Sequence, residues 1–184
     1  PQLSWLISDE PSVSSDGVVG GISYGLLAVF FFAKNYAISV GILRSHTGGK
    51  LKFGNESSFN INGSYKTFPA NSGMKYTLNY FEIPVGLKLK TKLFRRIGYY
   101  GQLGLTPMIN TKATTADGDK LTDEIQIGDI GYHFGGGIEY SLGGETYLHA
   151  AIFYTSGLID ITTNDNLSDY TKLNTINLRL GINF

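Results

Sequence analysis

The chain ends in the stretch "NLRLGINF", residues 177–184, in which two kinds of side chain alternate strictly. Alternate residues of an extended strand point to opposite faces. The apolar face carries Leu178, Leu180, Ile182 and Phe184, and the polar face carries Asn177, Arg179, Gly181 and Asn183. In a soluble sandwich the apolar face would be the inner one. In a membrane barrel it faces lipid, and the polar face lines the lumen.

Composition narrows the choice between these two folds. The 184 residues carry no net formal charge and no cysteine, which argues against a nucleic-acid partner, a disulfide framework and a thiolate metal site. The content of 24 glycines, 12 tyrosines and 11 phenylalanines is typical of β proteins. The longest apolar run, residues 25–33, is about half of the roughly 20 residues that a membrane-spanning helix needs. The length predicts one domain, residues 1–184.

Period-two alternation recurs along most of the chain and indicates β-strands. Seven of the alternating segments are long, and one, at the start, is short. The predicted strands are residues 1–7, 19–32, 36–46, 76–91, 97–112, 127–142, 146–159 and 171–184. Their number is even, as single-chain barrels of the bacterial outer membrane require.

The connections between these strands alternate in length. The short ones are residues 33–35, 92–96 and 143–145, and the long polar ones are residues 8–18, 47–75, 113–126 and 160–170. In an up-and-down meander, alternate connections lie at the same end. All long loops therefore fall at one end, which is the asymmetry of outer-membrane barrels, with short periplasmic turns and long outer loops.

The two faces of the predicted strands differ in a way that favours a barrel. In the fourth strand, one face carries Phe81, Ile83, Val85, Leu87 and Leu89, and the other carries Glu82, Pro84, Gly86, Lys88 and Lys90. Glycine weakens a solvent-washed strand, but a cramped barrel interior needs small residues between large ones. The sequence therefore predicts an all-β fold, an eight-stranded antiparallel up-and-down transmembrane β-barrel with short periplasmic turns and long extracellular loops. A lipocalin-like carrier, with an apolar lumen and a polar outside, is the soluble alternative.

A family resemblance rests on three stretches of sequence. "NYFEIPVGLKLK", residues 79–90, resembles the Leu-Glu-Ile-Pro strand of the PorT-like barrel family of Bacteroidetes outer membranes. "IGYYGQLGLTPMIN" is similar to the strand that follows, and "TSGLIDI", residues 155–161, to the end of the penultimate strand. The resemblance implies an eight-stranded barrel in the outer membrane and no single activity. Members serve as structural or accessory subunits, some of them in secretion and motility machinery.

Charged residues on the inward faces predict a filled lumen. Glu82, Lys88, Glu139 and Arg179 all point inward on their predicted strands, and buried charges must be paired or they cost several kcal/mol each. We expect Glu82 to reach Arg179 and Glu139 to reach Lys88. His133 is expected to fill the lumen beside this network.

Two further groups of residues are predicted to be recognised by other proteins. The longest connection, residues 47–75, carries Phe53, Phe59, Tyr65 and Phe68, and exposed aromatic residues on a long loop favour contact with a partner. The alternative is that this loop folds over the barrel mouth as a lid. Leu180, Ile182 and Phe184 resemble the C-terminal signal that the outer-membrane assembly machinery reads.

Catalytic and ligand-binding chemistry is sparse. Ser45 and His46 are adjacent, but we interpret them as residues at the end of a loop. The acidic run in residues 116–124 lacks the spacing of an EF-hand, so we interpret it as a solvated loop. We therefore predict no catalytic residue, no metal site and no cofactor.

These observations predict a protein of the bacterial outer membrane that is not an enzyme. Its expected partners are the lipid and lipopolysaccharide of that membrane and other outer-membrane or periplasmic proteins, with no nucleic acid. The alternative is a small-barrel enzyme or a narrow pore acting on lipid or small solutes. The first strand is shorter than the about 9–11 residues needed to cross, so we expect the native strand to begin before Pro1, or a second chain or a distortion to cover the edge.

Overall fold

The computed structural model describes residues 1–8, 13–54, 57–61, 64–115, 127–159 and 171–184. Within these ranges no helix is long and apolar enough to cross a membrane. The described residues form β-strands and their connections. The strands are β1 Gln2–Ser8, β2 Val13–Ser15, β3 Val19–Ala33, β4 Tyr36–Phe53, β5 Ser57–Ile61, β6 Ser64–Phe68, β7 Ser72–Glu82, β8 Val85–Lys90, β9 Ile97–Thr115, β10 Gly128–Gly143, β11 Thr146–Gly157 and β12 Thr171–Asn183.

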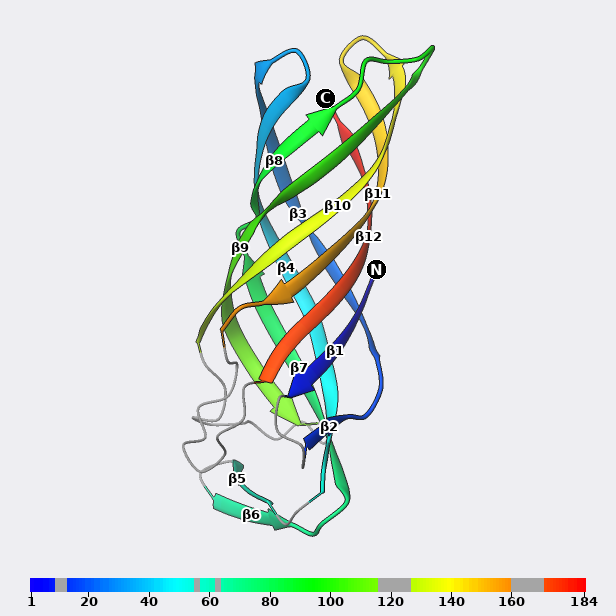
Figure 1. Ribbon diagram of the computed structural model, residues 1–184. Helices are drawn as coiled ribbons and strands as arrows, with labels where there is room; N and C mark the ends of the chain where they lie inside the picture. The colour runs from blue at the N-terminus through cyan, green and yellow to red at the C-terminus, as the bar shows by residue number, and fades with distance from the viewer. Residues whose placement is uncertain (9–12, 55–56, 62–63, 116–126, 160–170) are drawn as a thin grey trace.

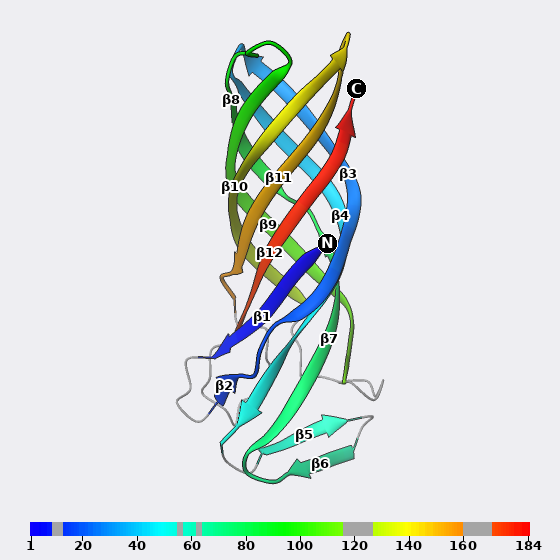
Figure 2. The same cartoon turned by 90° about the vertical axis from the view of Figure 1, so that its right-hand side faces the viewer.

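The wall of the molecule is a closed antiparallel ring (Figures 1 and 2). In the described part of the chain the order is β1, β3, β4, then β7 and β8 as one interrupted strand, then β9, β10, β11 and β12, which pairs with β1 again. This ring of eight strands confirms the predicted fold class. The fourth predicted strand is divided into β7 and β8 at Ile83 and Pro84, because proline has no N–H to give to the ladder.

The strand ends that the short connections join lie at the opposite end of the barrel from those that the long connections join, as predicted (Figure 1). The short turn between β10 and β11 shows how the sequence closes a hairpin. Gly144, the first residue of the two-residue turn, has φ +59°, and Gly143, at the bulge that precedes the turn, has φ +116°; glycine adopts both conformations freely.

Two strands run beyond the limits predicted from the sequence. β4 continues to Phe53 and β7 begins at Ser72, and the pairing from Thr47 with Leu78 to Phe53 with Ser72 is unbroken. The connection predicted over residues 47–75 is therefore reduced to residues 54–71, and within it β5 pairs with β6 as a hairpin. In both views this β4–β7 ribbon projects beyond the neighbouring strands (Figures 1 and 2).

The outside of the ring is apolar, as the alternation predicted. Large side chains on the outward face remain more than a third exposed, among them Leu26, Phe30, Ile42, Leu87, Leu103, Phe134, Ile152 and Leu180. Aromatic residues gather toward the short-turn end, including Phe32, Tyr36 and Tyr99. An apolar belt with aromatic residues at its edge is the exterior of a transmembrane barrel.

The inside of the ring is apolar at the long-loop end. Residues from six strands pack there into one buried cluster, which we call the apolar plug: Leu6, Val13, Leu51, Phe53, Met74, Tyr76, Leu78, Tyr80, Met108 and Leu173. The ionic network predicted to plug the lumen does not extend into this half, which apolar residues fill instead. The reason is that β4 and β7 stay paired beyond the predicted strand ends, so Leu51, Phe53 and Met74 add apolar side chains to the inward face of the wall.

The first strand is short, and the wall is unevenly paired beside it. β1 pairs with β12 from Gln2 opposite Asn177 to Ser8 opposite Thr171, as predicted. With β3 it pairs only from Gln2 opposite Gly21 to Ser4 opposite Val19. Beyond that point, among the described residues, one backbone bond from Leu178 N to Pro1 O continues the β1 side of β12. The amino terminus lies about halfway along the barrel, between β12 and β3 (Figure 2).

Candidate functional site

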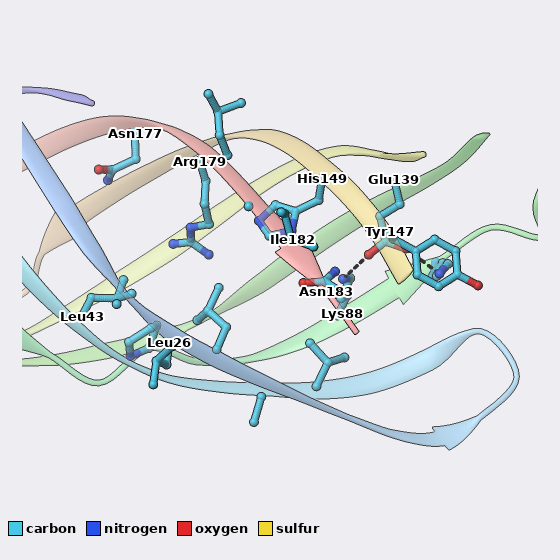
Figure 3. Close-up of a pocket in the computed structure, with 18 of the residues that line it drawn as sticks. Leu26, Leu43, Lys88, Glu139, Tyr147, His149, Asn177, Arg179, Ile182 and Asn183 are labelled. Carbon is cyan, nitrogen blue, oxygen red and sulfur yellow. Dashed lines mark hydrogen bonds and ion pairs between the residues drawn. The ribbon is translucent and has the colours of Figure 1, made fainter. Parts of the chain in front are cut away.

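The lumen at the short-turn end contains a charged cluster built on β8 and β10. Lys88 and Lys90 are two apart on β8 and therefore share the inward face. The Glu139 carboxylate forms an ion pair with each lysine. Lys88 Nζ lies 2.6 Å from Oε1, and Lys90 Nζ lies 2.5 Å from Oε2. The predicted pairing of Glu139 with Lys88 is thus present (Figure 3).

Aromatic rings complete the surroundings of the two ammonium groups. Lys88 Nζ lies 4.1 Å from the centroid of the Tyr100 ring, and Lys90 Nζ lies 4.4 Å from that of Tyr147. The face of an aromatic ring attracts a cation. The rings therefore offset part of the positive charge that one carboxylate leaves uncompensated.

The expected contact of Glu82 with Arg179 is not a direct ion pair in the described part of the chain, although the two charges attract each other across the lumen. The Arg179 guanidinium lies over the ring of Phe153, with Cζ 4.1 Å from the centroid. Arg179 is directly opposite Ala151 on β11, so Phe153 is its diagonal neighbour. A cation and a ring on adjacent strands meet without crossing the lumen, whereas Glu82 belongs to β7 on another part of the wall.

His133 fills the lumen as predicted and is 2 % exposed. Gln102 Nε2 lies 3.1 Å from His133 Nε2, and Thr106 Oγ1 lies 2.8 Å from His133 Nδ1. The Gln102 amide nitrogen can only donate, so His133 Nε2 accepts and Nδ1–H donates to Thr106. These contacts hold a neutral imidazole in one orientation and give it a packing role.

A cavity of about 1210 Å³ lies in the short-turn half of the molecule, lined by inward residues and also by outward residues of β3 and β12 such as Leu26 and Leu180. Its lining includes Glu82, Lys88, Glu139 and Arg179, the four charged residues of the predicted network, together with His149. Arg179 and His149 point toward this space in Figure 3. The lumen is therefore divided into a polar, hollow half and the half filled by the apolar plug.

The remaining candidates for chemistry do not form a site among the described residues. Ser45 is buried and on the inward face of β4, while His46 is on the outward face and contacts Asn79 Oδ1 through Nδ1. Adjacent residues of a strand point away from each other, so these two cannot act as a nucleophile and base. No group of three metal-ligating side chains occurs within the described ranges. The acidic run in residues 116–124 lies outside them.

The prediction of an exposed partner loop is wrong for one of its four aromatic residues. Phe53 is 3 % exposed and belongs to the apolar plug, because it ends the inward side of β4 opposite Ser72. Phe59, Tyr65 and Phe68 belong to the backbone of β5 and β6, and their side chains lie outside what the structure describes. The contact role predicted for these three stays a prediction.

The proposed assembly signal lies on the outward face of the last strand. Leu180 is 65 % exposed, Ile182 is 59 % exposed and Phe184 is 97 % exposed. The three side chains continue the apolar face of β12 to the short-turn end. Their accessibility is compatible with reading by another protein during assembly, and that role stays a prediction.

The apolar plug is the feature that sequence reasoning missed. Counting by twos from outward Phe81 would have revealed it, since Met74, Tyr76, Leu78 and Tyr80 then fall on the inward face. Tyr76, Leu78 and Tyr80 lie within the predicted strand of residues 76–91, and only Met74 falls in the connection predicted over residues 47–75.

A closed ring of antiparallel strands with an apolar exterior and aromatic residues at its edge is the architecture of a β-barrel of the bacterial outer membrane. Residues 4–163 match the family described as outer membrane protein beta-barrel domain, and the chain belongs to that family. No curated protein matches the chain.

Proposed function

We propose that this outer-membrane barrel has no enzymatic activity and acts as a structural, docking or accessory subunit of an outer-membrane protein complex. The PorT-like resemblance of residues 79–90 suggests secretion, motility or assembly machinery of a Bacteroidetes outer membrane as the setting. Its partners would be other outer-membrane or periplasmic proteins. The observation that carries this proposal is the apolar plug.

The plug supports a barrel that conducts nothing through its outer half. Leu6, Leu78 and Tyr80 are each no more than 1 % exposed, and all three belong to the plug. A dry, close-packed interior leaves no path for a solute, and eight strands leave room for side chains only. The function is therefore expected at the surfaces of the molecule.

The projecting β4–β7 ribbon is the proposed docking element. Thr47–Phe53 pair with Ser72–Leu78 along a continuous ladder, so the ribbon is held firmly to the wall. The β5–β6 hairpin lies at its tip (Figure 2). A rigid support with a second hairpin at its end suits contact with another protein.

Replacing the tip of the ribbon tests this role. Phe53 and Ser72 are the last paired residues, so residues 54–71 can be exchanged for Asn-Gly, which closes a two-residue hairpin between paired strands. We expect normal insertion, seen as the heat-modifiable band of a folded barrel, and loss of the native complex in pull-downs from native membranes.

A control variant keeps the loop and removes its side chains. Phe59, Tyr65 and Phe68 are replaced together by serine, which should weaken the complex if these aromatic residues make the contact. A complex that survives both changes would contradict the docking role and favour the lid.

A narrow pore is the second candidate function, because a cavity of about 1210 Å³ lies in the short-turn half of the molecule. The apolar plug at the opposite half argues against it. For an enzyme the described residues offer no comparable support, since Ser45 and His46 are on opposite faces of β4.

A further inference from the structure

Five cations lie on the outward face of the wall at the long-loop end. They are Arg44, Lys50, Lys52, Lys75 and Lys112, which we call the basic column. On β4 and β7 their immediate neighbours Leu43, Leu51 and Met74 are buried on the inward face, which fixes Arg44, Lys50, Lys52 and Lys75 on the outward one. Lys112 is exposed on β9 opposite Asn79. The column was not expected from the sequence, because three of its members fall in residues 47–75.

The register of β4 and β7 brings like charges together. Lys50 is directly opposite Lys75, and Lys52 is opposite Gly73, which makes Lys52 a diagonal neighbour of Lys75. Directly opposed side chains have Cβ atoms about 4.5–5.5 Å apart, and like charges in that position destabilise a sheet. The fold accepts this repulsion at a site where other residues would be more stable.

Little within the described residues compensates these charges. None of the five cations forms an ion pair there. Asp16 is a described carboxylate beside the column, with Oδ2 3.3 Å from the place a Cβ on Gly73 would take. Within the described residues the column therefore carries more positive than negative charge, and an anionic ligand would neutralise it.

The position of the column relative to the apolar belt indicates the kind of anion. Ile38 and Ile42 precede Arg44 on the outward face of β4, and they are 45 % and 62 % exposed. Leu105 and Ile109 precede Lys112 in the same way on β9. The column therefore begins where the lipid-facing belt ends, on the outer side of the membrane and on the wall instead of the mouth.

The extent of the column along the membrane normal distinguishes a phospholipid ligand from a glycolipid ligand. Lys50 is six residues beyond Arg44, which is roughly 20 Å along a strand and about 15 Å along the membrane normal at a tilt of about 40°. The headgroup layer of a phospholipid leaflet is only about 5–8 Å thick. A phospholipid cannot meet both ends of the column, whereas a glycolipid with charged groups along its sugars can.

We propose that the basic column binds lipopolysaccharide of the outer leaflet. Arg44 and Lys112 meet the phosphates on the acylated sugars, and Lys50, Lys52 and Lys75 meet phosphates or carboxylates of the core sugars. Each contact is a charge-assisted hydrogen bond, and an anion between Lys50 and Lys75 removes their repulsion. The proposal requires the outer-membrane location. Lys50, Lys52 and Lys75 lie on the β4–β7 ribbon, and the test of the docking role leaves them in place because it exchanges only residues 54–71.

Binding of purified lipopolysaccharide to the full chain in detergent tests the proposal. The double variant K50Q/K75Q should bind at least about tenfold more weakly, which corresponds to about 1.4 kcal/mol. The matched control K34Q/K92Q removes the same charge from the short-turn end and should bind within about twofold of the unmodified chain. Equal affinity of K50Q/K75Q and the unmodified chain would overturn the proposal, as would an equal loss in the control.

Two more measurements separate this site from a general attraction. Without lipopolysaccharide, K50Q/K75Q should melt at a higher temperature than the unmodified chain, because the like-charge repulsion is gone. Lipopolysaccharide lacking its core sugars should bind both proteins alike, since Lys50 and Lys75 have no ligand there. A lower melting temperature, or phosphatidylglycerol vesicles that compete as well as lipopolysaccharide, would contradict the proposal.

Discussion

At the scale of single residues, the charged side chains of the lumen are stabilised in two different ways. Glu139 is 2 % exposed and is shared by Lys88 and Lys90. Buried charges are retained only where their partners and hydrogen bonds are complete. The Arg179 guanidinium stacks on the ring of Phe153 and does not contact a carboxylate of the described residues directly.

Replacing Glu139 by Gln should be strongly destabilising. The change leaves two ammonium groups without a counter-charge in the lumen, and breaking a buried pair costs about 3–5 kcal/mol. Urea unfolding of the refolded barrel, followed by tryptophan fluorescence of Trp5, measures the loss.

The control for this change is Glu145→Gln. Glu145 is exposed in the turn between β10 and β11, where a substitution changes stability by less than about 0.5 kcal/mol. Equal unfolding curves for the two variants would show that the Glu139 cluster contributes nothing.

At the scale of single elements, inward glycines let adjacent strands approach. A Cβ on Gly135 of β10 would lie 2.7 Å from Phe153 Cα and would also collide with the carbonyl oxygen of Ile152. Gly20 of β3 has no neighbour within 4 Å of its Cβ position. Close packing therefore requires glycine at position 135, whereas position 20 has room for a larger residue.

Gly135→Ala should destabilise the barrel by about 1–3 kcal/mol, because the overpacked wall must shift. Gly20→Ala should leave stability equal or slightly higher, since alanine restricts the unfolded chain more than glycine. The same urea titration measures both variants. A Gly135→Ala protein as stable as Gly20→Ala would contradict the close packing of β10 and β11.

At the scale of the whole molecule, the barrel is divided along its axis. The short-turn half contains the charged cluster and a cavity, and the long-loop half contains the apolar plug. Function is therefore expected on the outer surfaces, at the β4–β7 ribbon and the basic column.

The plug predicts that the purified barrel does not conduct. In planar lipid bilayers at neutral pH we expect no discrete current steps, while a general porin reconstituted in the same way supplies the positive control. Regular steps from the barrel alone would contradict the plug and favour the narrow pore.

The sequence by itself determined the fold class, the order of the wall strands and the lipid-facing side chains. These depend on alternation within each strand and on connection lengths, which are local properties. Residues 177–184 show this, since Leu178, Leu180 and Ile182 are exposed as their spacing predicts. The same counting identified Lys88, Glu139 and His133 as inward residues.

Only the tertiary structure decided which inward residues meet. Arg179 packs on Phe153 and not on Glu82, and Phe53 is buried where a loop was expected. The opposition of Lys50 and Lys75 likewise became visible only in the ladder. Each of these contacts depends on the stagger between strands and on how far two strands stay paired. Packing around the whole ring sets the stagger and the paired length. Neither can therefore be predicted from the alternation within a single strand.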